Sequence, residues 1–432
     1  MINVGIIGFG TVGTGTASIL IGNRKLLKDR TGIDINLKKI ADLDIKRDRG
    51  IKLPKGVLTT DADSVISDPD IHIIVELIGG TTIAKDIVLK AIRNGKHVVT
   101  ANKALLATHG KEIFRAAARA NVRVGFEASV AGGIPIIKII SEGLVANRIK
   151  SIYGIINGTT NYILSKMSDE HAEFSDVLKE AQELGYAEAD PTYDIEGIDS
   201  AHKIAILASL AYGTQFSLKD VYREGISWIS SMDIEFAREL GYKLKLLAIT
   251  KETNGKIELR VHPTMVPEDF LISKVDGVFN AVYVEGDAVG STLYYGRGAG
   301  DMPTGSAVVS DIVDISCGIV SGTVGRSPFF SEDKQRKELL KMDDVRSMYF
   351  FRFSALDKPG VLSKISGILG KYNISIASVI QKDRREGKAV PLVVLTHSAR
   401  EKDVLTAVKE INRLPAVAGK TVFIRVEGRE QS

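Results

Sequence analysis

Two residues of opposite charge stand four positions apart in DIEGIDSAHKIAIL, residues 194–207. In a helix, Asp199 and Lys203 share one face, and Leu207 continues that face. A surface ion pair is one explanation of this spacing. The other is a reaction that needs a proton in a dry place, because a positioned ammonium group can act as a general acid.

A second lysine follows a run that is typical of a buried strand. Lys103 stands in VVTANKALLA, behind a small Ala-Asn pair. The carboxyl ends of strands in an open parallel sheet face the ligand crevice. Lys103 is therefore placed to touch a substrate or a nicotinamide, and a solvated loop lysine is the alternative.

The segment before the helical lysine carries the densest cluster of acidic residues. Glu188 and Asp194 precede Asp199 in GYAEADPTYDIEGIDSAHK. One carboxylate could bind a substrate ammonium and another could hold the lysine. Acids in loops are usually solvated, and solvation is the favoured interpretation of Asp190 and Glu196.

Two further runs have the composition of ligand loops. NGTTNYIL (157–164) follows a strand pattern and offers a polar nest for a carboxylate, although an ordinary capped helix explains it as well. YYGRGAGDMPTGS (294–306) brings several glycines, Gly300 among them, to the start of a helix. Glycines there would let the backbone approach a ligand closely.

The N-terminal run INVGIIGFGTVGTGTA has the pattern of a dinucleotide-binding turn. Gly8, Gly10 and Gly13 form G-x-G-x-x-G between a strand pattern and a helix pattern, which is the context that the motif requires. The three glycines allow a tight turn, a close approach to a pyrophosphate, and packing of helix on strand. A glycine-rich turn without a ligand is the alternative.

An acidic residue should close the second strand and bind the adenosine ribose. Asp42 is the candidate, although it stands later than the usual spacing of about 20 residues. Lys46 and Arg47 follow it and could meet a 2′-phosphate, so the sequence does not choose between NAD and NADP. A plain turn residue is the alternative for Asp42.

The order of elements predicts an α/β fold class with three domains. Strand-like and helical runs alternate over residues 1–128, which is typical of a Rossmann-type parallel sheet covered on both faces. Residues 129–328 are mixed α/β, with one helix expected over 233–250. The charged residues 329–347 suggest a linker, and residues 348–432 follow the βαββαβ order of a self-sufficient ferredoxin-like module.

The composition is that of a soluble globular protein. Of 432 residues, 44% are hydrophobic and 25% charged, and the net charge of +4 is too small and diffuse for nucleic acid or an anionic membrane. No run reaches the roughly 18 apolar residues that span a bilayer, and no signal peptide is evident, so a cytoplasmic location is expected. Cys317, the single cysteine, excludes an internal disulfide and is expected to fill a core.

Six motifs together resemble those of the homoserine dehydrogenase family. They stand in the family's order over residues 1–322: GFGTVG, TANKALLA, EASVAGGIP, NGTTNYIL, GYAEADPTYDIEGIDSAHK and GRGAGDMPTGSAVVSDI. The tail LDKPGVLSKISGILGKYNISIASVIQK resembles an ACT domain. The resemblance implies a catalytic and dimerisation domain after the Rossmann domain. It also implies NAD(P)H-dependent, reversible reduction of L-aspartate 4-semialdehyde to L-homoserine, in threonine, methionine and isoleucine biosynthesis.

The resemblance also implies roles for single residues. Lys203 matches the proton donor to the aldehyde oxygen, Lys103 a second lysine at the reacting centre, and Asp199 a substrate-binding carboxylate that orients Lys203. Glu188 matches a substrate ligand, and Asp194 is added from the acidic cluster. Cofactor contacts are expected at Gly8, Phe9, Gly10, Thr11, Val12, Gly13, Asp42, Lys103, Gly185 and Gly300. A structural sodium ion, a hard cation that favours oxygen ligands, is expected at Glu127, Val130, Gly132 and Ile134.

The ACT-like tail implies regulation by an amino acid, with threonine expected from the family pattern. The turn from Asp357 to Gly360 would present backbone groups at a helix start to a carboxylate. A module that only mediates subunit contact is the alternative, and a homodimer or homotetramer is expected because ACT modules commonly pair their sheets. Two other functions stay open: a non-catalytic amino-acid sensor, which the intact lysine–aspartate set argues against, and another nicotinamide-dependent dehydrogenase.

Overall fold

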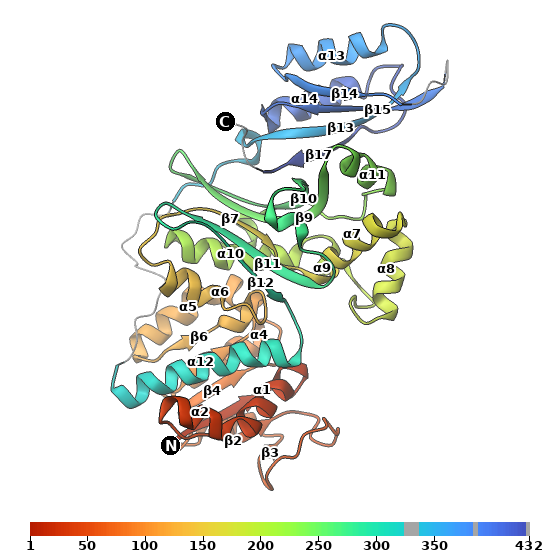
Figure 1. Cartoon of the computed structure of the whole chain (residues 1–432). Coiled ribbons are helices and arrows are strands. Elements are labelled where there is room, and N and C mark those ends of the chain that lie inside the picture. Colours follow the sequence, from red (N-terminus) through yellow and green to blue (C-terminus); the bar gives the residue numbers. More distant parts are fainter. Residues whose placement is uncertain (324–336, 383–387, 429–432) are drawn as a thin grey trace. The chain divides into compact units, whose positions relative to one another are not determined.

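The computed structural model describes residues 1–323, 337–382 and 388–428. They belong to two compact units, which are described separately (Figure 1). The first unit comprises Met1–Gly158, Asp199–Val221 and Val278–Lys337, and the second comprises Thr159–Ile198, Tyr222–Gly277 and Glu338–Ser432. The middle section of the sequence therefore contributes to both units. Residues 329–336 of the expected linker lie outside the described residues.

A six-stranded parallel sheet forms the core of the first unit, in the order β3-β2-β1-β4-β5-β6. Its strands are β1 (Ile2–Ile7), β2 (Ile35–Ala41), β3 (Leu58–Thr59), β4 (Ile73–Glu76), β5 (His97–Thr100) and β6 (Val124–Gly125). The helices between them are α1 (Thr11–Gly22), α2 (Arg24–Thr31), α3 (Ala62–Ser67), α4 (Thr82–Arg93) and α5 (Lys103–Ala120). The Rossmann-type sheet predicted from the sequence is confirmed. Its order reverses at β1 and β4, where such folds bind ligands outside the carboxyl ends of the strands.

The strands of this sheet are buried on both faces. Val4 and Ile6 of β1 pack with residues of α1, α2 and α12, whereas Ile7 and Ile74 pack with residues of α3, α4 and α5. A strand between two apolar cores needs no polar face, which explains why apolar residues of INVGII point to both faces of the sheet. The two helical layers leave the carboxyl ends of the strands as the place where polar side chains can gather.

Helix α12 (Asp301–Ser321) packs closely against α1 in the first unit (Figure 1). A Cβ at Gly15 would lie 2.1 Å from the Asp301 carbonyl oxygen, and one at Gly305 would lie 2.8 Å from the Gly15 carbonyl carbon. By length and composition α12 is also long and apolar enough to cross a membrane, which the sequence did not lead us to expect. Half of its apolar stretch is buried, however, and its residues Val308, Ile312 and Ile315 belong to the core of the sheet.

Cys317 lies on the exposed side of α12, so the expectation that it fills a core is wrong. The buried stripe of α12 passes through Ile312, Ile315 and Ser316, and residue 317 falls beside it. Apolar residues stand all around this helix, and such a run does not show which face is buried.

The other elements of the first unit carry the candidate site. They are η1 (Glu127–Ser129), α6 (Ile136–Lys138), η2 (Ile139–Gly143), β7 (Ile149–Ile155), α10 (Ile198–Tyr212), η3 (Leu218–Asp220), β11 (Phe279–Gly286) and β12 (Gly290–Arg297). β7 pairs antiparallel with β11, and β11 pairs antiparallel with β12. Nearly every residue of α10 is buried, which places its charged side chains among apolar ones.

The second unit holds the rest of the middle section. Its elements there are α7 (Gly158–Glu170), α8 (Phe174–Glu183), α9 (Thr192–Ile195), β8 (Tyr222–Arg223), α11 (Ser231–Glu239), β9 (Tyr242–Thr253), β10 (Lys256–Pro267) and η4 (Leu271–Lys274). The single helix expected over 233–250 is wrong, because α11 ends at Glu239 and β9 follows. Gly241 between them has φ +80°, a conformation in which glycine commonly ends helices. After it, Lys and Leu alternate with the period of a strand.

The C-terminal section has the predicted βαββαβ order. Its elements are η5 (Met342–Asp344), β13 (Arg346–Leu356), α13 (Val361–Lys371), β14 (Ile376–Ile380), β15 (Ala389–Thr396), β16 (Ala399–Arg400), α14 (Glu401–Ile411) and β17 (Val422–Val426). The antiparallel sheet β17-β13-β15-β14 is ferredoxin-like.

The sequence suggested a self-sufficient module, and the structure adds that its sheet continues into the middle section. β17 pairs in parallel with β10 through Thr264–Arg425 and Met265–Val426. Leu339, in the described part of the expected linker, also bridges to Ile257 of β10.

Candidate active site

Asp199 and Lys203 lie on one face of α10, as their spacing predicts. Lys203 Nζ donates to Asp199 Oδ2 at 2.7 Å and to the Ile156 carbonyl oxygen at 2.7 Å. Lys103 Nζ lies 2.6 Å from Asp199 Oδ1. One carboxylate therefore holds two ammonium groups. We call Lys103, Asp199 and Lys203 the lysine–aspartate cluster.

The cluster is buried at the aspartate and more open at the lysines. The side chain of Asp199 is 4% exposed, that of Lys203 is 11% exposed, and that of Lys103 is 31% exposed. Burial alone would raise the pKa of Asp199, but the charges of Lys203 and Lys103 outweigh it and hold the pKa well below its ordinary value. Two ammonium groups against one carboxylate leave a positive charge that can stabilise an oxygen on which negative charge grows.

Two neighbours of the cluster were not predicted to take part. Asn157 Nδ2 donates to Asp199 Oδ2 at 2.9 Å, and the Ile156 carbonyl accepts from Lys203. Both residues directly follow β7, and Asn157 begins the run for which a carboxylate nest and a capped helix are the two interpretations. An amide side chain directly after a buried strand was the signal that could have identified Asn157.

Lys103 is the first residue of α5, which excludes the alternative of a loop lysine. Asn102 caps the helix, since its Oδ1 accepts the Leu105 amide at 3.0 Å. Asn102 Nδ2 also donates to the Gly80 carbonyl at 2.6 Å, which ties the start of α5 to the loop after β4. The cap thus sets the direction in which Lys103 leaves the backbone.

The glycine-rich turn after β1 has the geometry that its motif predicts. Gly8 has φ +103°, and a Cβ there would lie 2.6 Å from the Leu77 carbonyl carbon. A Cβ at Gly13 would lie 2.2 Å from the Gly8 carbonyl oxygen, whereas one at Gly10 would meet no atom within 4 Å. The turn is therefore closely packed on the protein side and open at the N-terminus of α1, where helix amides can face phosphates. Phe9 is buried, Thr11 is exposed and Val12 is half-buried.

Asp42 directly follows β2, where a ribose-binding acid is expected. Its Oδ2 accepts the Phe9 amide at 2.5 Å, and its Oδ1 lies 3.3 Å from the Arg49 guanidinium. Arg49 also donates to the Phe9 carbonyl at 2.5 Å and lies 4.7 Å from the centre of the Phe9 ring. The sequence pointed to Lys46 and Arg47 and not to Arg49, because a stacking contact over Phe9 leaves no local pattern.

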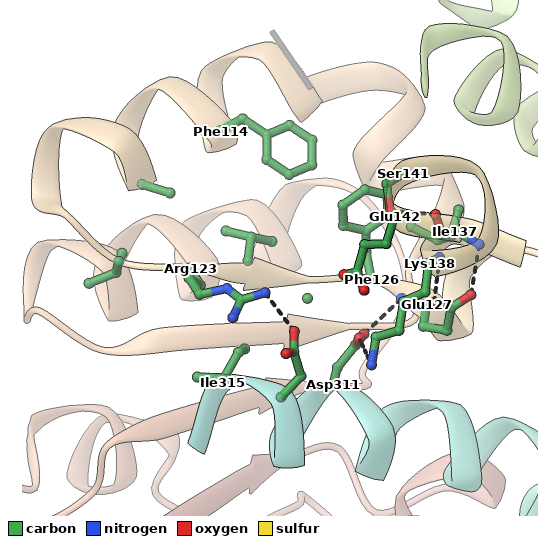
Figure 2. A pocket seen from close by; sticks show the side chains of 15 residues that line it. Phe114, Arg123, Phe126, Glu127, Ile137, Lys138, Ser141, Glu142, Asp311 and Ile315 are labelled. Atoms are coloured by element: carbon green, nitrogen blue, oxygen red, sulfur yellow. Dashed lines mark hydrogen bonds and ion pairs between the residues drawn. The ribbon is translucent and has the colours of Figure 1, made fainter. Parts of the chain in front are cut away.

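Glu127, the expected sodium ligand with a side chain, is a buried carboxylate beside a small cavity (Figure 2). Its oxygens accept the amides of Ile137 at 2.8 Å and Lys138 at 2.9 Å. Burial, with the nearby Asp311 carboxylate, raises the pKa of Glu127 to about 7. Burial likewise raises the pKa of Asp311 to about 6.

The cavity beside Glu127 has a volume of about 50 Å³. Val130, Gly132 and Ile134, the other three expected sodium ligands, do not line it. Within the described ranges, no three His, Cys, Asp or Glu side chains gather as metal ligands. A sodium site built mainly from main-chain oxygens therefore stays a prediction.

In the glycine-rich run 294–306, packing explains why one position is a glycine, which the sequence did not reveal. A Cβ at Gly298 would lie 1.9 Å from Asn280 Nδ2, so a side chain is sterically excluded there. Gly300 precedes α12 with φ +123°. Its contact with the cofactor stays a prediction.

Three predicted ligand residues belong to the second unit. Gly185 has φ +75° and, like Glu188, is exposed, while Asp194 lies half-buried in α9. Asn161 of the expected carboxylate nest donates to the carbonyls of Val275 and Gly277, so its amide fastens α7 to that loop. The roles of Gly185, Glu188 and Asp194 stay predictions.

The turn between β13 and α13 carries the expected effector site. Gly360, with φ +85°, directly precedes α13. The Asp357 amide donates to the Lys388 carbonyl at 2.9 Å, and Gln381 Nε2 donates to Asp357 Oδ1 at 3.3 Å. The backbone at the start of α13 has the predicted form, and effector binding there is a prediction.

The fold and the clusters above define an NAD(P)-dependent oxidoreductase whose chain ends in an ACT domain. Models of the homoserine dehydrogenase NAD-binding domain, of homoserine dehydrogenase and of the ACT domain match residues 8–127, 135–313 and 349–416.

Known proteins resemble the chain over nearly its whole length. A homoserine dehydrogenase from Neisseria gonorrhoeae is 50% identical over 99% of this chain and 98% of that protein. The crystal structure of a homoserine dehydrogenase from Thiobacillus denitrificans matches with a TM-score of 0.93 and 50% identity, over 99% of this chain and 98% of that one. A hyperthermophilic archaeal homoserine dehydrogenase in complex with NADPH matches with a TM-score of 0.62 and 28% identity, over 73% of this chain and 97% of that one. The chain belongs to the homoserine dehydrogenase family and is an enzyme of amino-acid biosynthesis.

Proposed function

We propose that this enzyme reversibly reduces L-aspartate 4-semialdehyde to L-homoserine with Lys203 as the proton donor. The observation that carries the proposal is the lysine–aspartate cluster, in which one buried carboxylate holds two ammonium groups. A nicotinamide supplies the hydride when it is bound. The protein contributes the position of the aldehyde and the electrostatic field around its oxygen.

The proton transfer follows from the geometry around Lys203. Negative charge grows on the aldehyde oxygen as its carbon gains a hydride, and Lys203 Nζ gives that oxygen a proton to form the hydroxyl. Asp199 and the Ile156 carbonyl hold the Lys203 ammonium group, which has N–H donors and no acceptor, in the position from which it gives up a proton. In the reverse direction the neutral amine takes the proton back. Lys103 adds a second positive charge at Asp199.

The reaction can be tested with the purified enzyme. Reduced cofactor and aspartate semialdehyde are mixed, the loss of reduced-nicotinamide absorbance is followed, and homoserine is identified by mass spectrometry. Other aldehydes and amino acids serve as comparison substrates. Faster turnover of another aldehyde, with no homoserine formed, would contradict the proposal.

For the substrate, we propose that Glu188 and Asp194 bind the ammonium group of the amino acid. The acidic character of the segment supports this proposal. Asp199 contributes the carboxylate nearest the lysines. Glu188→Gln should raise the KM for semialdehyde more than it lowers kcat, because it removes a binding charge and no proton donor. Glu183→Gln, also exposed and acidic, is the matched control.

For the cofactor, we propose NADP(H), held by the glycine-rich turn, by Asp42 and Lys103, and by the backbone at Gly185 and Gly300. The support for a phosphorylated ribose is Arg49, whose guanidinium lies beside Asp42. Arg49→Gln should raise the KM for NADPH more than that for NADH. An equal change for both cofactors would argue that Arg49 only packs on Phe9.

We propose a structural sodium ion near Glu127, with carbonyl oxygens of Val130, Gly132 and Ile134. The support is a buried carboxylate whose ionised form a cation would stabilise. Sodium chloride should raise the melting temperature more than choline chloride at equal ionic strength. Glu127→Gln should remove that difference.

We propose feedback regulation by threonine at the Asp357–Gly360 turn. The ACT sheet is joined to β10, and Arg425 of β17 donates to Glu224 at 2.9 and 3.0 Å. Two residues further on, the Ile226 amide donates to the Ile195 carbonyl of α9 in the acidic segment. This connected route within the second unit could carry an effector's influence toward residues expected to bind substrate.

Regulation should be tested by substitution and not by truncation. Removing the ACT domain would uncover β10 and leave Glu224 without its guanidinium partner. Threonine should lower the turnover of the full chain, and Asp357→Asn should weaken that response. Methionine and isoleucine are the comparison effectors, and no response to any of them would favour a module for subunit contact.

We also propose a homodimer or homotetramer in the cytoplasm, and a division into functional domains at residues 128, 328 and 347. Size-exclusion chromatography with light scattering measures the assembly. The family membership and the predicted pairing of ACT sheets support the proposal. A monomer at working concentration would contradict it.

A further inference from the structure

Glu76 is a fully buried carboxylate that the proposed reaction does not use. It ends β4 and is 0% exposed, and its neighbour across the sheet, Thr100, ends β5 and is also 0% exposed. Thr100 Oγ1 donates to Glu76 Oε2 at 2.7 Å. Burying a carboxylate is costly unless hydrogen bonds compensate. Burial raises the pKa of Glu76 above its ordinary value in spite of the hydrogen bonds that it accepts.

On one side, Glu76 holds the loop that follows β4. Its Oε1 accepts the amides of Ile78 at 3.0 Å and Gly79 at 3.3 Å. This loop runs beside the glycine-rich turn, since a Cβ at Gly8 would lie 2.6 Å from Leu77. The carboxylate therefore fixes backbone that lines the carboxyl end of the sheet, next to the dinucleotide-binding turn.

On the other side, Glu76 reaches α5 through Thr100. The Thr100 hydroxyl accepts the Asn102 amide at 3.0 Å, and Asn102 caps α5. Asn102 Nδ2 returns to the loop after β4 through the Gly80 carbonyl, so the loop and the helix start are tied together. The next residue is Lys103, whose Nζ lies 2.6 Å from Asp199.

We propose that Glu76 is a positioning residue for the reduction, acting through Thr100 and Asn102 on Lys103. We call Glu76, Thr100 and Asn102 the buried latch. The inference rests on the proposed role of Lys103 at the reacting centre. It adds a residue that touches neither substrate nor the lysine–aspartate cluster.

The physical reason is that the start of α5 sets the direction of the Lys103 side chain. The bonds of the latch fix where α5 begins, and a change at a helix start moves the long side chain that leaves from it. A misplacement of about 1 Å can cost a reaction about 10²-fold. An apolar residue in place of Glu76 would leave two amides and one hydroxyl without their acceptor, so the loop and the helix start would shift to find others.

The first test replaces Glu76 by Met and by Gln. Glu76→Met should lower kcat by about 10²-fold, by the misplacement argument, with a smaller change in the KM for semialdehyde. Glu76→Gln should keep most of the turnover, because its carbonyl can accept the Ile78 and Gly79 amides while its NH₂ donates to Thr100. Rescue by the amide would show that turnover depends on the shape and the hydrogen bonds of residue 76.

Lys96→Met is the matched control for a purely structural effect. Lys96 is buried, and its Nζ donates to the carbonyls of Asp68 and Ile71 at 2.7 Å each. It lies at the opposite end of the same strands, just before β5. Lys96→Met should lower the melting temperature and leave the kcat of the folded enzyme unchanged. An equal kcat for Glu76→Met and Lys96→Met would overturn the inference.

Thr100→Val and Thr100→Ser keep the test decisive if Glu76→Met does not fold. Valine keeps the shape and removes the hydroxyl, whereas serine keeps the hydroxyl. Thr100→Val should lower kcat and Thr100→Ser should not. Equal values for the two would contradict a role of the latch.

A combination with Lys103→Met separates this inference from the proposed role of Lys103. If the latch acts through Lys103, then Thr100→Val in the Lys103→Met background should lower kcat by a much smaller factor than in the wild type. An unchanged factor would overturn the inference. Wild-type kcat in Lys103→Met alone would instead refute the role of Lys103.

Discussion

In the first unit, one buried carboxylate faces two ammonium groups, whereas in the second unit each buried guanidinium faces two carboxylates. Arg260 contacts Glu258 at 3.0 Å and Glu427 at 2.5 Å. Arg425 contacts Glu224 at 2.9 Å and also Glu401, whose side chain is 0% exposed. We call these two arginines and four glutamates the arginine–glutamate cluster.

The two clusters differ in what they leave unbalanced. In the arginine–glutamate cluster the guanidinium groups are 1% exposed, and Tyr349 and Lys251 complete the bonding of Glu401 and Glu427. Two guanidinium groups and Lys251 face four carboxylates there, so negative charge is in excess, and every glutamate except Glu224 is at most 7% exposed. In the lysine–aspartate cluster positive charge is in excess and Lys103 is partly open. A positive excess in a partly open site is useful for catalysis, whereas a cluster that is closed to ligands serves to join strands and helices.

Lys203→Met should have the largest effect on activity. We expect turnover to fall by about 10²–10⁴-fold, the usual contribution of a positioned general acid. Stability should change little, because Asp199 keeps its ion pair with Lys103. Steady-state kinetics measure the loss, and cofactor binding by fluorescence should persist. Turnover at the wild-type level would refute the assignment of Lys203.

Arg425→Met should lower stability strongly and turnover little, the reverse of Lys203→Met. Its loss leaves the buried Glu401 without a guanidinium, and breaking a buried ion pair typically costs about 3–5 kcal/mol. Urea unfolding measures the free energy, and turnover per folded molecule should stay close to that of the wild type. Glu224→Gln, which keeps the shape of one partner, should show a smaller loss of the same sign. A stable Arg425→Met protein would mean that water reaches the glutamates.

A fall in pH should lower stability through both clusters, and only one of the two carboxylates should also affect turnover. Burial would raise the pKa of Asp199 and that of Glu427, but lysine and arginine charges outweigh it and lower both pKa values. A carboxyl whose folded pKa is depressed adds stability above its unfolded pKa of about 4, and this is lost as pH falls toward the folded value. Asp199→Asn and Glu427→Gln should therefore both flatten the fall in urea midpoint between pH 5 and pH 3, about the unfolded pKa. Only Asp199→Asn should also lower turnover.

Short-range patterns were enough to predict much of the molecule. The glycine-rich turn, the parallel sheet and the Asp199–Lys203 spacing each follow from neighbours within a few residues in the sequence. The ferredoxin-like order was predicted for the same reason. The helix expected over 233–250 failed because one glycine divides a run whose apolar content suits both periods.

Contacts between residues far apart in the sequence could not be predicted. Asn157 meets Asp199 across 42 positions, Arg49 stacks on Phe9 across 40, and Arg425 reaches Glu224 across 201. None of these pairs shares a helical face or a turn. The pairing of β17 with β10 belongs to the same class, since a single strand carries no sign of its partner.

The smallest effect is expected at a pair with good geometry on the surface. Arg24 donates to both oxygens of Asp34, at 2.8 and 3.0 Å, as Arg425 does to those of Glu224. The Arg24 side chain is 43% exposed, however, and exposed pairs contribute little because water and salt replace them. Asp34→Asn should leave the urea midpoint and turnover almost unchanged at moderate salt. A loss comparable to that of Arg425→Met would show that bidentate geometry, and not burial, sets the strength of these pairs.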